Sequence, residues 1–389
     1  MVGIKKVYQV LTNLNCNLNC SYCYENKGRG RNDIESIKNF LSACYERDFG
    51  MKREKKEYPD IWVELVGGET LMYPDMLDEI CEHVQKLHFR YEIPTQFNVG
   101  ISTNGTLILQ DEAVRKFLRK WAHVISIGFS IDGTQEIHDK CRVDTEGKGS
   151  YERAVSGYEW TRSVIPPCRI GAKATYCHET ISKYAEGVIN LIKLGFREIG
   201  ANVVYEEVWK KEEAMEIAKQ LFKVVDYLVD NNLEDKVHIF QLNNPEMDIR
   251  KYPLMLKAMK GKEQNYCGSC EHMTCIGFDN KIYGCNRFCT MKEPIPLGKL
   301  KGAVMDITNT ALKTEVKEQY KIWPEECRQC PYWAQCPSCA AIPYEVNKED
   351  TSTYYAFKPQ CGWTHAIVAA KMYFVRCLQA RDAEEEKSE

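Results

Sequence analysis

Three cysteines stand close together near the N-terminus, in the segment "LTNLNCNLNCSYCYENKG". They are Cys16, Cys20 and Cys23. Thiolates at this spacing can hold three irons of a [4Fe–4S] cluster and leave the fourth iron open for another ligand. A zinc site is the alternative, but structural zinc prefers four protein ligands, and no fourth cysteine or histidine lies nearby in the sequence. The segment therefore predicts an iron–sulfur cluster with one open iron.

A second group of cysteines lies in the C-terminal third of the chain. Ten of the 19 cysteines fall between residues 267 and 361. Disulfides rarely persist in a reducing cytoplasm, and clustered cysteines in an intracellular protein indicate metal binding. Ten thiols are enough for two clusters with four ligands each, and paired zinc knuckles are the structural alternative.

Length and charge limit the kind of protein that can carry these cysteines. The 389 residues are enough for one large domain and a smaller one. The net charge of -3 argues against nucleic acid or an anionic membrane as the main partner. No apolar stretch approaches the ~18 to 20 residues of a membrane span, and the first ten residues lack the apolar region of a secretory signal. We expect a cytoplasmic protein with no nucleic-acid or membrane partner.

The N-terminal half alternates between segments typical of strands and segments typical of helices. Short, apolar, β-rich runs occupy residues 6–12, 61–66, 97–102, 124–130, 170–176 and 199–205. Their nearly continuous apolar character is typical of parallel strands that are covered on both faces. Apolar residues recur at helical spacing between them, for example over 33–49, 111–121 and 210–230.

Six such βα units predict an α/β fold, a partial (β/α)6 TIM-like barrel, because a complete barrel needs eight units. Chemistry in such folds takes place at the C-terminal ends of the strands, and the cysteine triplet follows the first strand. We expect the barrel over residues 1–230, a connector over 231–264, and a small cysteine-rich domain with a C-terminal helix over 265–378. Residues 379–389 should form an acidic tail that is solvated and frayed.

The CxxxCxxC triplet, with Tyr22 before its last cysteine, resembles the signature of the radical S-adenosylmethionine (radical SAM) superfamily. The resemblance implies that S-adenosylmethionine binds the open iron through its amino and carboxylate groups. Reductive cleavage of this cofactor would then yield a 5′-deoxyadenosyl radical that abstracts hydrogen from the substrate.

Further motifs follow the next strands and suit the same cofactor. The glycines of "VGGET" allow close backbone approach, its glutamate suits an ammonium group, and the arginine of "HDKCRVD" suits a carboxylate. An Asn-Gly turn in "STNGT" and a surface salt bridge of the arginine are the simpler alternatives. The resemblance implies a cofactor-binding set of Tyr22, Gly67, Gly68, Glu69, Ser102, Asn104, Ser130, Asp132 and Arg142.

The segments "CEHMTCIGFDNKIYGC" and "CRQCPYWAQCPSC" resemble the SPASM domain, which carries two auxiliary [4Fe–4S] clusters. The resemblance implies an inner cluster held by Cys267, Cys270, Cys285 and Cys339, and an outer cluster held by Cys327, Cys330, Cys336 and Cys361. Three [4Fe–4S] clusters are then expected in total. Only two residues separate Cys336 from Cys339, where three are usual. Cys275 or Cys289 could replace Cys339, or the inner cluster could lack a fourth protein ligand.

Two segments, "SIDGTQEIHDKCRVDTEGKGSY" and "IGANVVYEEVW", resemble radical enzymes paired with Cys-xxx-repeat precursor peptides. This resemblance implies a peptide maturase that forms thioether cross-links from cysteine. Its partners would be a ribosomally made precursor peptide and a reductant such as flavodoxin or ferredoxin. The first strand begins within ten residues of the start, so we expect leader recognition to use a separate leader-binding protein, the connector or the C-terminal region.

Anaerobic sulfatase-maturating enzymes, which form formylglycine, are the alternative. The matching members of that family place a basic aspartate after the cysteine equivalent to Cys285, but this chain has Asn286, and an amide cannot accept a proton. A non-enzymatic iron–sulfur electron-transfer protein is the third hypothesis, and it predicts no S-adenosylmethionine site. No catalytic residue is assigned from the sequence.

Overall fold

The computed structural model describes residues 5–25, 28, 30–50, 59–259, 267–318, 324–336, 339–346 and 360–388. The chain forms two compact units. The first unit contains Met1–Phe129, Val143–Arg169 and Cys267–Gln319. The second contains Ser130–Arg142, Ile170–Tyr266 and Tyr320–Glu389.

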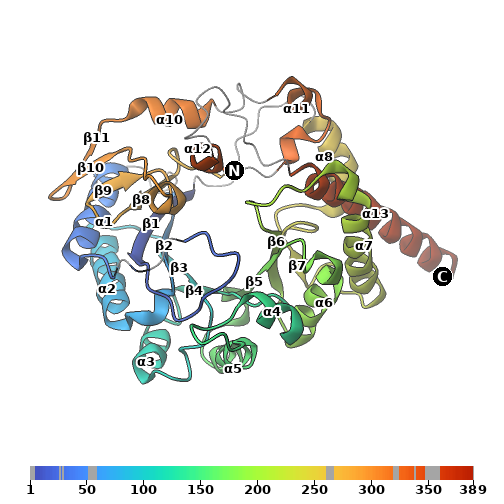
Figure 1. Cartoon of the computed structure of the whole chain (residues 1–389), viewed down its shortest axis with the longest axis horizontal. Helices are drawn as coiled ribbons and strands as arrows, with labels where there is room; N and C mark the ends of the chain where they lie inside the picture. The colour runs from blue at the N-terminus through green and yellow to red at the C-terminus, as the bar shows by residue number, and fades with distance from the viewer. Residues whose placement is uncertain are drawn as a thin grey trace. The chain divides into compact units, whose positions relative to one another are not determined.

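The first unit is built on four parallel strands that follow one another along the chain (Figure 1). These are β1 (Lys5–Asn13), β2 (Asp60–Gly67), β3 (Asn98–Thr103) and β4 (Ile125–Phe129). The first three are followed by α1 (Ile34–Phe49), α2 (Pro74–Arg90) and α3 (Glu112–Lys120), and the unit also holds α5 (Tyr151–Arg162), η2 (Thr70–Met72) and η3 (Pro167–Arg169). The first four predicted strands and the helices predicted over 33–49 and 111–121 are thus confirmed.

Local sequence explains where the helices of this unit begin. The Asp33 side chain accepts the main-chain N–H of Ser36 and caps α1, and Asp111 caps α3 in the same way by accepting from Ala113. An N-cap of this kind satisfies an N–H group that has no partner inside the helix.

Strands from the cysteine-rich region extend the sheet of the first unit. β8 (Met273–Ile276) pairs with β1 in parallel, with Val7 opposite Met273. β9 (Lys281–Tyr283), β10 (Gly298–Lys301) and β11 (Val304–Ile307) continue from it with antiparallel pairings. Asn280 adopts a φ of 56° in the turn between β8 and β9. α9 (Asn286–Thr290) and α10 (Thr310–Lys317) complete this part.

The second unit contains three parallel strands, β5 (Ile170–Tyr176), β6 (Glu198–Val203) and β7 (His238–Ile239). Its longer helices are α4 (Gln135–Cys141), α6 (Tyr184–Leu194), α7 (Ala214–Asp230), α8 (Tyr252–Met259) and α13 (Cys361–Ser388). Shorter helices are α11 (Glu325–Gln329), α12 (Ile342–Val346), η4 (Ile181–Lys183), η5 (Lys211–Glu213), η6 (Ile249–Lys251) and η8 (Trp333–Gln335). The last two predicted strands are confirmed, and the region predicted as a connector contains β7 and α8.

α13 is longer than the sequence predicted, and it packs along α7 (Figure 1). The tail that we expected to be frayed from residue 379 is exposed but helical as far as Ser388. Two causes explain the difference. Alanine, glutamate and lysine have high helix propensity, and Arg381 forms an ion pair with the buried Glu234 at 2.6 Å.

The predicted α/β class is confirmed, because parallel strands alternate with helices in both units. The contacts divide the region predicted as one cysteine-rich domain between the two units. The predicted boundary at residues 264–265 lies outside the described residues, and the domain boundaries stay predictions. Among the described residues, no helix is both long and apolar enough to cross a membrane.

Candidate functional site

The N-terminal cysteines lie on a loop directly after β1, as the sequence predicted. Cys16 and Cys20 are half-buried and Cys23 is exposed. The buried Leu18 anchors the middle of the loop, and the N–H of Asn19 donates to the carbonyl of Val143 at 2.7 Å. The three thiols therefore sit on a tethered loop and remain within reach of a cluster.

An amide network ties the same loop to the end of β3. Asn104 Nδ2 donates to Asn17 Oδ1 at 2.9 Å, and Asn17 Nδ2 donates to Thr106 Oγ1 at 2.8 Å. Asn104 Oδ1 in turn accepts from the Thr106 hydroxyl at 2.7 Å. Asn104, which the resemblance to the family places in the cofactor-binding set, also supports the cysteine loop.

The two glycines at the end of β2 allow this loop to approach. A Cβ atom at Gly67 would lie 2.3 Å from the carbonyl oxygen of Asn13, and one at Gly68 would lie 2.3 Å from that of Asn15. Neither contact is possible for a side chain. We expected the glycines to admit a ligand, and the structure shows that they admit the backbone that leads into Cys16.

Glu69 is buried, with 1% of its surface exposed. Its carboxylate accepts from Thr103 Oγ1 at 2.7 Å and from the main-chain N–H groups of Asn104 at 2.7 Å and Leu71 at 3.0 Å. Burial raises its pKa, and these hydrogen bonds act in the opposite direction. Since an ionised carboxylate can accept about four hydrogen bonds, capacity for about one more donor remains, such as an ammonium group.

Arg142 and Asp132 form a bidentate pair in the second unit. Arg142 Nε donates to Asp132 Oδ2 at 2.8 Å, and Nη2 donates to Oδ1 at 3.1 Å. Asp132 also accepts the N–H of Thr175 at 2.9 Å, so it joins the segment after β4 to β5. The salt bridge considered for Arg142 exists, and it is buried.

The nine predicted cofactor residues fall into two groups by unit. The first unit holds Tyr22, Gly67, Gly68, Glu69, Ser102 and Asn104, and the second holds Ser130, Asp132 and Arg142. Ser102 lies on β3, and Ser130 directly follows β4; both are half-buried. The assignment of these residues to S-adenosylmethionine stays a prediction.

The predicted inner cysteines Cys267, Cys270 and Cys285 lie in the first unit, whereas Cys339 lies in the second. Burial raises the pKa of Cys270 to about 11, and the charge of Cys267 acts in the same direction. Gly284 is required beside them, because a Cβ atom there would lie 2.2 Å from Cys270 Sγ.

The two alternative ligands lie in the same unit as Cys285. Burial raises the pKa of Cys275 on β8, and the charges of Cys289 and Cys285 raise it further. Cys289 lies on α9, which begins immediately after Cys285. The structure thus brings Cys275, Cys285 and Cys289 into one electrostatic group.

The four predicted outer cysteines also form one group, within the second unit. Burial raises the pKa of Cys336 to about 12, and the charges of Cys361, Cys327 and Cys330 act in the same direction. Burial also raises the pKa values of Cys327 and Cys361, and the charges of the neighbouring thiols raise them further. A metal must displace the protons that such pKa values hold on the sulfurs.

The arrangement of the thiols distinguishes a cluster from a single ion. Among the described residues, no three His, Cys, Asp or Glu side chains converge as one metal ion requires. In a four-iron cluster each thiolate binds a different iron, so the sulfurs surround a volume instead of one point.

Comparison with known proteins adds the family. Residues 10–177 match the model of the Radical SAM superfamily. This stretch begins within β1, contains the cysteine loop and ends directly after β5. The chain therefore contains a radical SAM domain. This domain implies a [4Fe–4S] cluster and S-adenosylmethionine, and the tethered, accessible thiols of Cys16, Cys20 and Cys23 fit the cluster.

The chain is similar in sequence to anaerobic sulfatase-maturating enzymes. It is 34% identical over 149 residues to the cysteine-type enzyme of Clostridium novyi, and the match covers 36% of each chain. The match therefore spans about a third of that relative's length. Identity to the cysteine-type enzyme of Clostridium perfringens strain 13 is 24% over 339 residues, covering 82% of this chain and 84% of the other.

Solved structures show the fold. Native anSMEcpe with bound AdoMet and Cp18Cys peptide matches with a TM-score of 0.68 and 18% identity, covering 97% of this chain and 99% of that chain. Streptococcus suis SuiB bound to precursor peptide SuiA matches with a TM-score of 0.56 and 13% identity, covering 89% and 73%. The predicted partial barrel is confirmed by this likeness in fold.

Sequence reasoning missed Glu25, two residues after Cys23. Burial raises its pKa to about 7, while Thr290 and the charge of Arg287 act in the opposite direction. Its Oε2 atom has no hydrogen-bond partner among the described residues. The residue is half-buried, and the only signal in the sequence was its place after the triplet.

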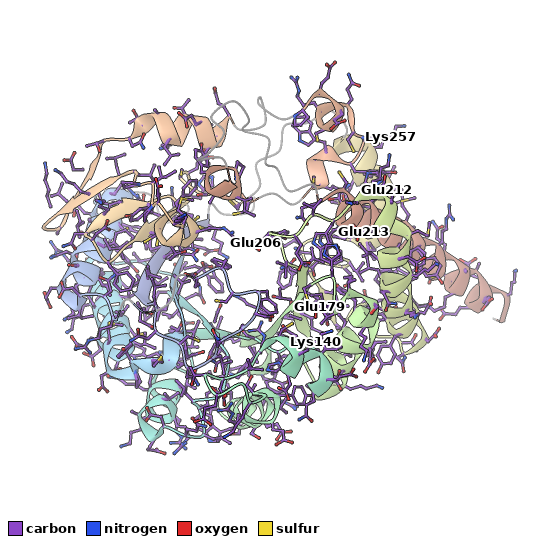
Figure 2. All side chains as sticks on the ribbon, viewed as in Figure 1. Lys140, Glu179, Glu206, Glu212, Glu213 and Lys257 are labelled. Atoms are coloured by element: carbon purple, nitrogen blue, oxygen red, sulfur yellow. The ribbon has the colours of Figure 1, made fainter. Side chains whose placement is uncertain are left out.

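A pair of thiols in the second unit was also missed. Cys141 Sγ, at the end of α4, lies 4.0 Å from Cys177 Sγ, directly after β5, and both residues are buried. The ion pair of Lys140 with Glu179, at 3.2 Å, joins the same two segments at the surface (Figure 2). These two contacts fix the end of α4, and with it Arg142, against the loop after β5.

Proposed function

We propose that this radical SAM enzyme modifies a ribosomally made precursor peptide by forming thioether cross-links from cysteine. One C–H and one S–H bond of the peptide are replaced by a C–S bond. S-adenosylmethionine accepts the hydrogen atom and one electron and is converted to 5′-deoxyadenosine and methionine. The thiol releases one proton, and one electron leaves the peptide, so that the electrons balance.

Asn286 carries this proposal. It follows Cys285 and is half-buried; its main-chain N–H donates to Gln9 Oε1 at 2.8 Å, and its Nδ2 lies 3.5 Å from the Tyr24 hydroxyl. An amide has no basic site at working pH. The residue therefore cannot serve as the proton acceptor that formylglycine formation would need at this position, whereas a cross-linking enzyme has no such requirement there.

The residues have the following proposed roles. Cys16, Cys20 and Cys23 hold the cluster that binds S-adenosylmethionine, and the nine cofactor residues named above contact or support that cofactor. The grouped outer thiols hold one auxiliary cluster. The inner cluster uses Cys267, Cys270 and Cys285 with Cys339, Cys275 or Cys289 as the fourth ligand, or keeps one iron open. When loaded, an auxiliary cluster can take up the electron and bind a substrate thiolate, since iron favours soft sulfur ligands.

The proposal includes partners that the chemistry requires. A low-potential reductant such as flavodoxin or ferredoxin supplies electrons, and a separate leader-binding protein, the connector or the C-terminal region recognises the precursor's leader. The many cysteines suit the reducing cytoplasm.

The decisive experiment is anaerobic incubation of the reconstituted enzyme with S-adenosylmethionine, a reductant and a small cysteine-rich peptide encoded next to its gene. We expect 5′-deoxyadenosine, a peptide lighter by two hydrogen atoms per cross-link, and one alkylatable thiol fewer for each. Alanine in place of Cys16, Cys20 and Cys23 should remove about four of about twelve irons and all cofactor cleavage.

Formylglycine formation is the second candidate function. The similarity to sulfatase-maturating enzymes favours it, and so does Glu25, a half-buried carboxylate whose pKa burial raises to about 7 and which could serve as a base in place of Asn286. This function would convert a substrate cysteine to an aldehyde that reacts with a hydrazide. A hydrazide-reactive product without any cross-link would replace the thioether proposal with this one.

A further inference from the structure

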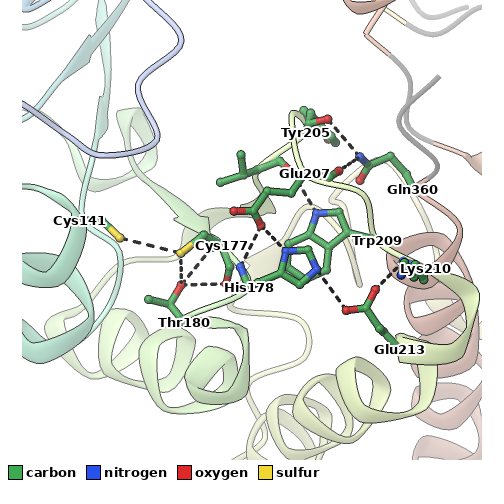
Figure 3. Close-up of polar contacts among 11 residues, drawn as sticks. Cys141, Cys177, His178, Thr180, Tyr205, Glu207, Trp209, Lys210, Glu213 and Gln360 are labelled. Carbon is green, nitrogen blue, oxygen red and sulfur yellow. Dashed lines mark hydrogen bonds and ion pairs between the residues drawn. The ribbon is translucent and has the colours of Figure 1, made fainter. Parts of the chain in front are cut away.

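Two loops of the second unit meet at a stacked pair of rings (Figure 3). The imidazole of His178, two residues after β5, lies flat on the indole of Trp209, with centroids 4.0 Å apart and planes at 8°. His178 Nδ1 lies 2.7 Å from Glu207 Oε2, and Nε2 lies 3.1 Å from Glu213 Oε1. The ring is fixed from its face and from both of its nitrogens.

The stack fixes the loop that follows β6, residues 204–210. Trp209 is fully buried, and its Nε1–H donates to the carbonyl of Val204 at 3.0 Å, which closes the loop on itself. The N–H of Val204 donates to the carbonyl of Tyr176 at 2.9 Å. The loop is thus attached to the end of β5 at its start and through the ring stack near its end.

This loop holds the chain on both sides of Cys361. Gln360 Nε2 donates to the carbonyls of Tyr205 at 3.3 Å and Glu207 at 3.2 Å. The N–H of Gly362 donates to the carbonyl of Trp209 at 2.8 Å. A Cβ atom at Gly362 would lie 2.2 Å from the carbonyl oxygen of Lys210, so the approach requires glycine.

Cys361 differs from the other outer cysteines in its support. It is the first residue of α13. Trp363, two residues later, is fully buried and packs against Tyr184, with ring centroids 5.7 Å apart. Tyr184 donates to the carbonyl of Ala201 on β6 at 3.2 Å. Cys327, in contrast, lies on a helix of five residues, and Cys330 and Cys336 directly follow short helices. Cys361 is therefore the thiol that is tied most firmly to the strands.

We infer that His178 and Trp209 are positioning residues for the outer cluster. By holding the loop 204–210, they set the place of Cys361 and hence of the cluster that Cys361 helps to hold. The inference rests on the proposed outer cluster. Loss of the imidazole should free the loop, loosen the Cys361 thiolate and weaken the hold on this cluster alone.

Iron release from the anaerobically reconstituted full chain to a coloured chelator tests the inference. In His178→Ala, about four irons should leave about tenfold faster, the order expected when one charge-assisted hydrogen bond is lost, and the remaining irons should leave at the wild-type rate. The electron paramagnetic resonance signal of the same cluster should change. Trp209→Phe keeps a ring to stack on but loses the indole N–H that the Val204 carbonyl accepts, so it should release the same irons faster than wild type and more slowly than His178→Ala.

His123→Ala is the matched control. His123 also stacks on a tryptophan, Trp121, with centroids 6.1 Å apart, but it lies in the first unit. Its loss should leave iron release unchanged. Gly362→Ala provides a second test. Alanine suits a helix, but its Cβ atom disrupts the contact with the loop directly, so this variant should release the same irons faster than wild type.

Two results separate failure of this inference from failure of the proposed function. If Cys361→Ala keeps all the iron of the wild type, the proposed outer cluster is wrong. If Cys361→Ala loses about four irons, while His178→Ala and Gly362→Ala both release iron at the wild-type rate with unchanged resonance signals, the cluster stands and the positioning role is overturned.

Discussion

The guanidinium of Arg142 donates two hydrogen bonds to the carboxylate of Asp132, at 2.8 Å and 3.1 Å. Both side chains are nearly removed from water, with 10% and 1% of their surface exposed. A buried charge that loses its partner is costly, because neither water nor another charge compensates it. The pair therefore decides whether the segment between β4 and α5 keeps its shape.

Asp132→Asn should lower the free energy of unfolding by about 3 to 5 kcal/mol, because it leaves the Arg142 charge buried without its carboxylate. Arg142→Lys keeps a charge but loses the bidentate geometry, and should cost less. Anaerobic thermal unfolding of both variants shows which of them loses more stability. Equal midpoints for Asp132→Asn and wild type would show that the pair does not support the fold.

Gly68→Ala should displace the cysteine loop, since the new Cβ atom would lie 2.3 Å from the Asn15 carbonyl oxygen. We expect the variant to lose about four irons per chain. Gly100→Ala on β3 is the control, because a Cβ atom there meets its nearest neighbour, Glu64 Cγ, at 3.4 Å. Iron analysis after reconstitution compares the two, and full iron content in Gly68→Ala would contradict the proposed role of the glycine.

Acid should destabilise the enzyme in part through His138. Burial lowers its pKa to about 4 from the ordinary 6.5, and its Nδ1 accepts the N–H of Asp132 at 3.4 Å. Between these values the unfolded chain binds a proton that the folded chain does not, so stability falls as the pH drops. The contribution between pH 7 and pH 5 is about 2 kcal/mol.

His138→Asn should therefore lose less stability than wild type over this interval. The measurement is the difference between the thermal midpoints at pH 7 and pH 5 for each protein. His123→Asn, at an exposed position, should keep the wild-type difference. The same pH difference in His138→Asn as in wild type would rule out this histidine as a source of the acid sensitivity.

Arg381→Ala should loosen the end of α13. Its partner Glu234 is 6% exposed, and the two are 2.6 Å apart. The variant leaves that carboxylate without its ion pair, at a cost of about 1 to 3 kcal/mol. Limited proteolysis should cut α13 sooner than in wild type. Arg376→Ala, at an exposed position of the same helix, should be cut at the wild-type rate.

The barrel strands could be predicted because each is a short apolar run followed by a helical pattern. β8 could not be predicted as part of that sheet. Its four residues, "MTCI", carry little signal, and its partner β1 lies more than 260 residues away in sequence. Helix propensity and the Arg381–Glu234 pair likewise decided the end of α13, against an expectation based on charge alone.

The site shows a similar division. The spacing of Cys16, Cys20 and Cys23 was sufficient to predict a cluster loop, because ligand spacing is local. The support of that loop by Gly68 and Asn104 depends on contacts between distant segments, which no single segment reveals. The grouping of the outer thiols was predicted from resemblance, whereas the closeness of Cys275 and Cys289 to Cys285 required the packing of α9 beside β8.

The amide network around Asn17 has a consequence for the order in which the protein matures. The cysteines are synthesised early, but their loop takes its shape from Asn104 and Thr106, 87 and 89 residues later in the chain. A nascent chain that ends before β3 has the ligands without the frame that holds them. Iron is therefore best delivered after translation has passed this point, to a barrel half that has already folded.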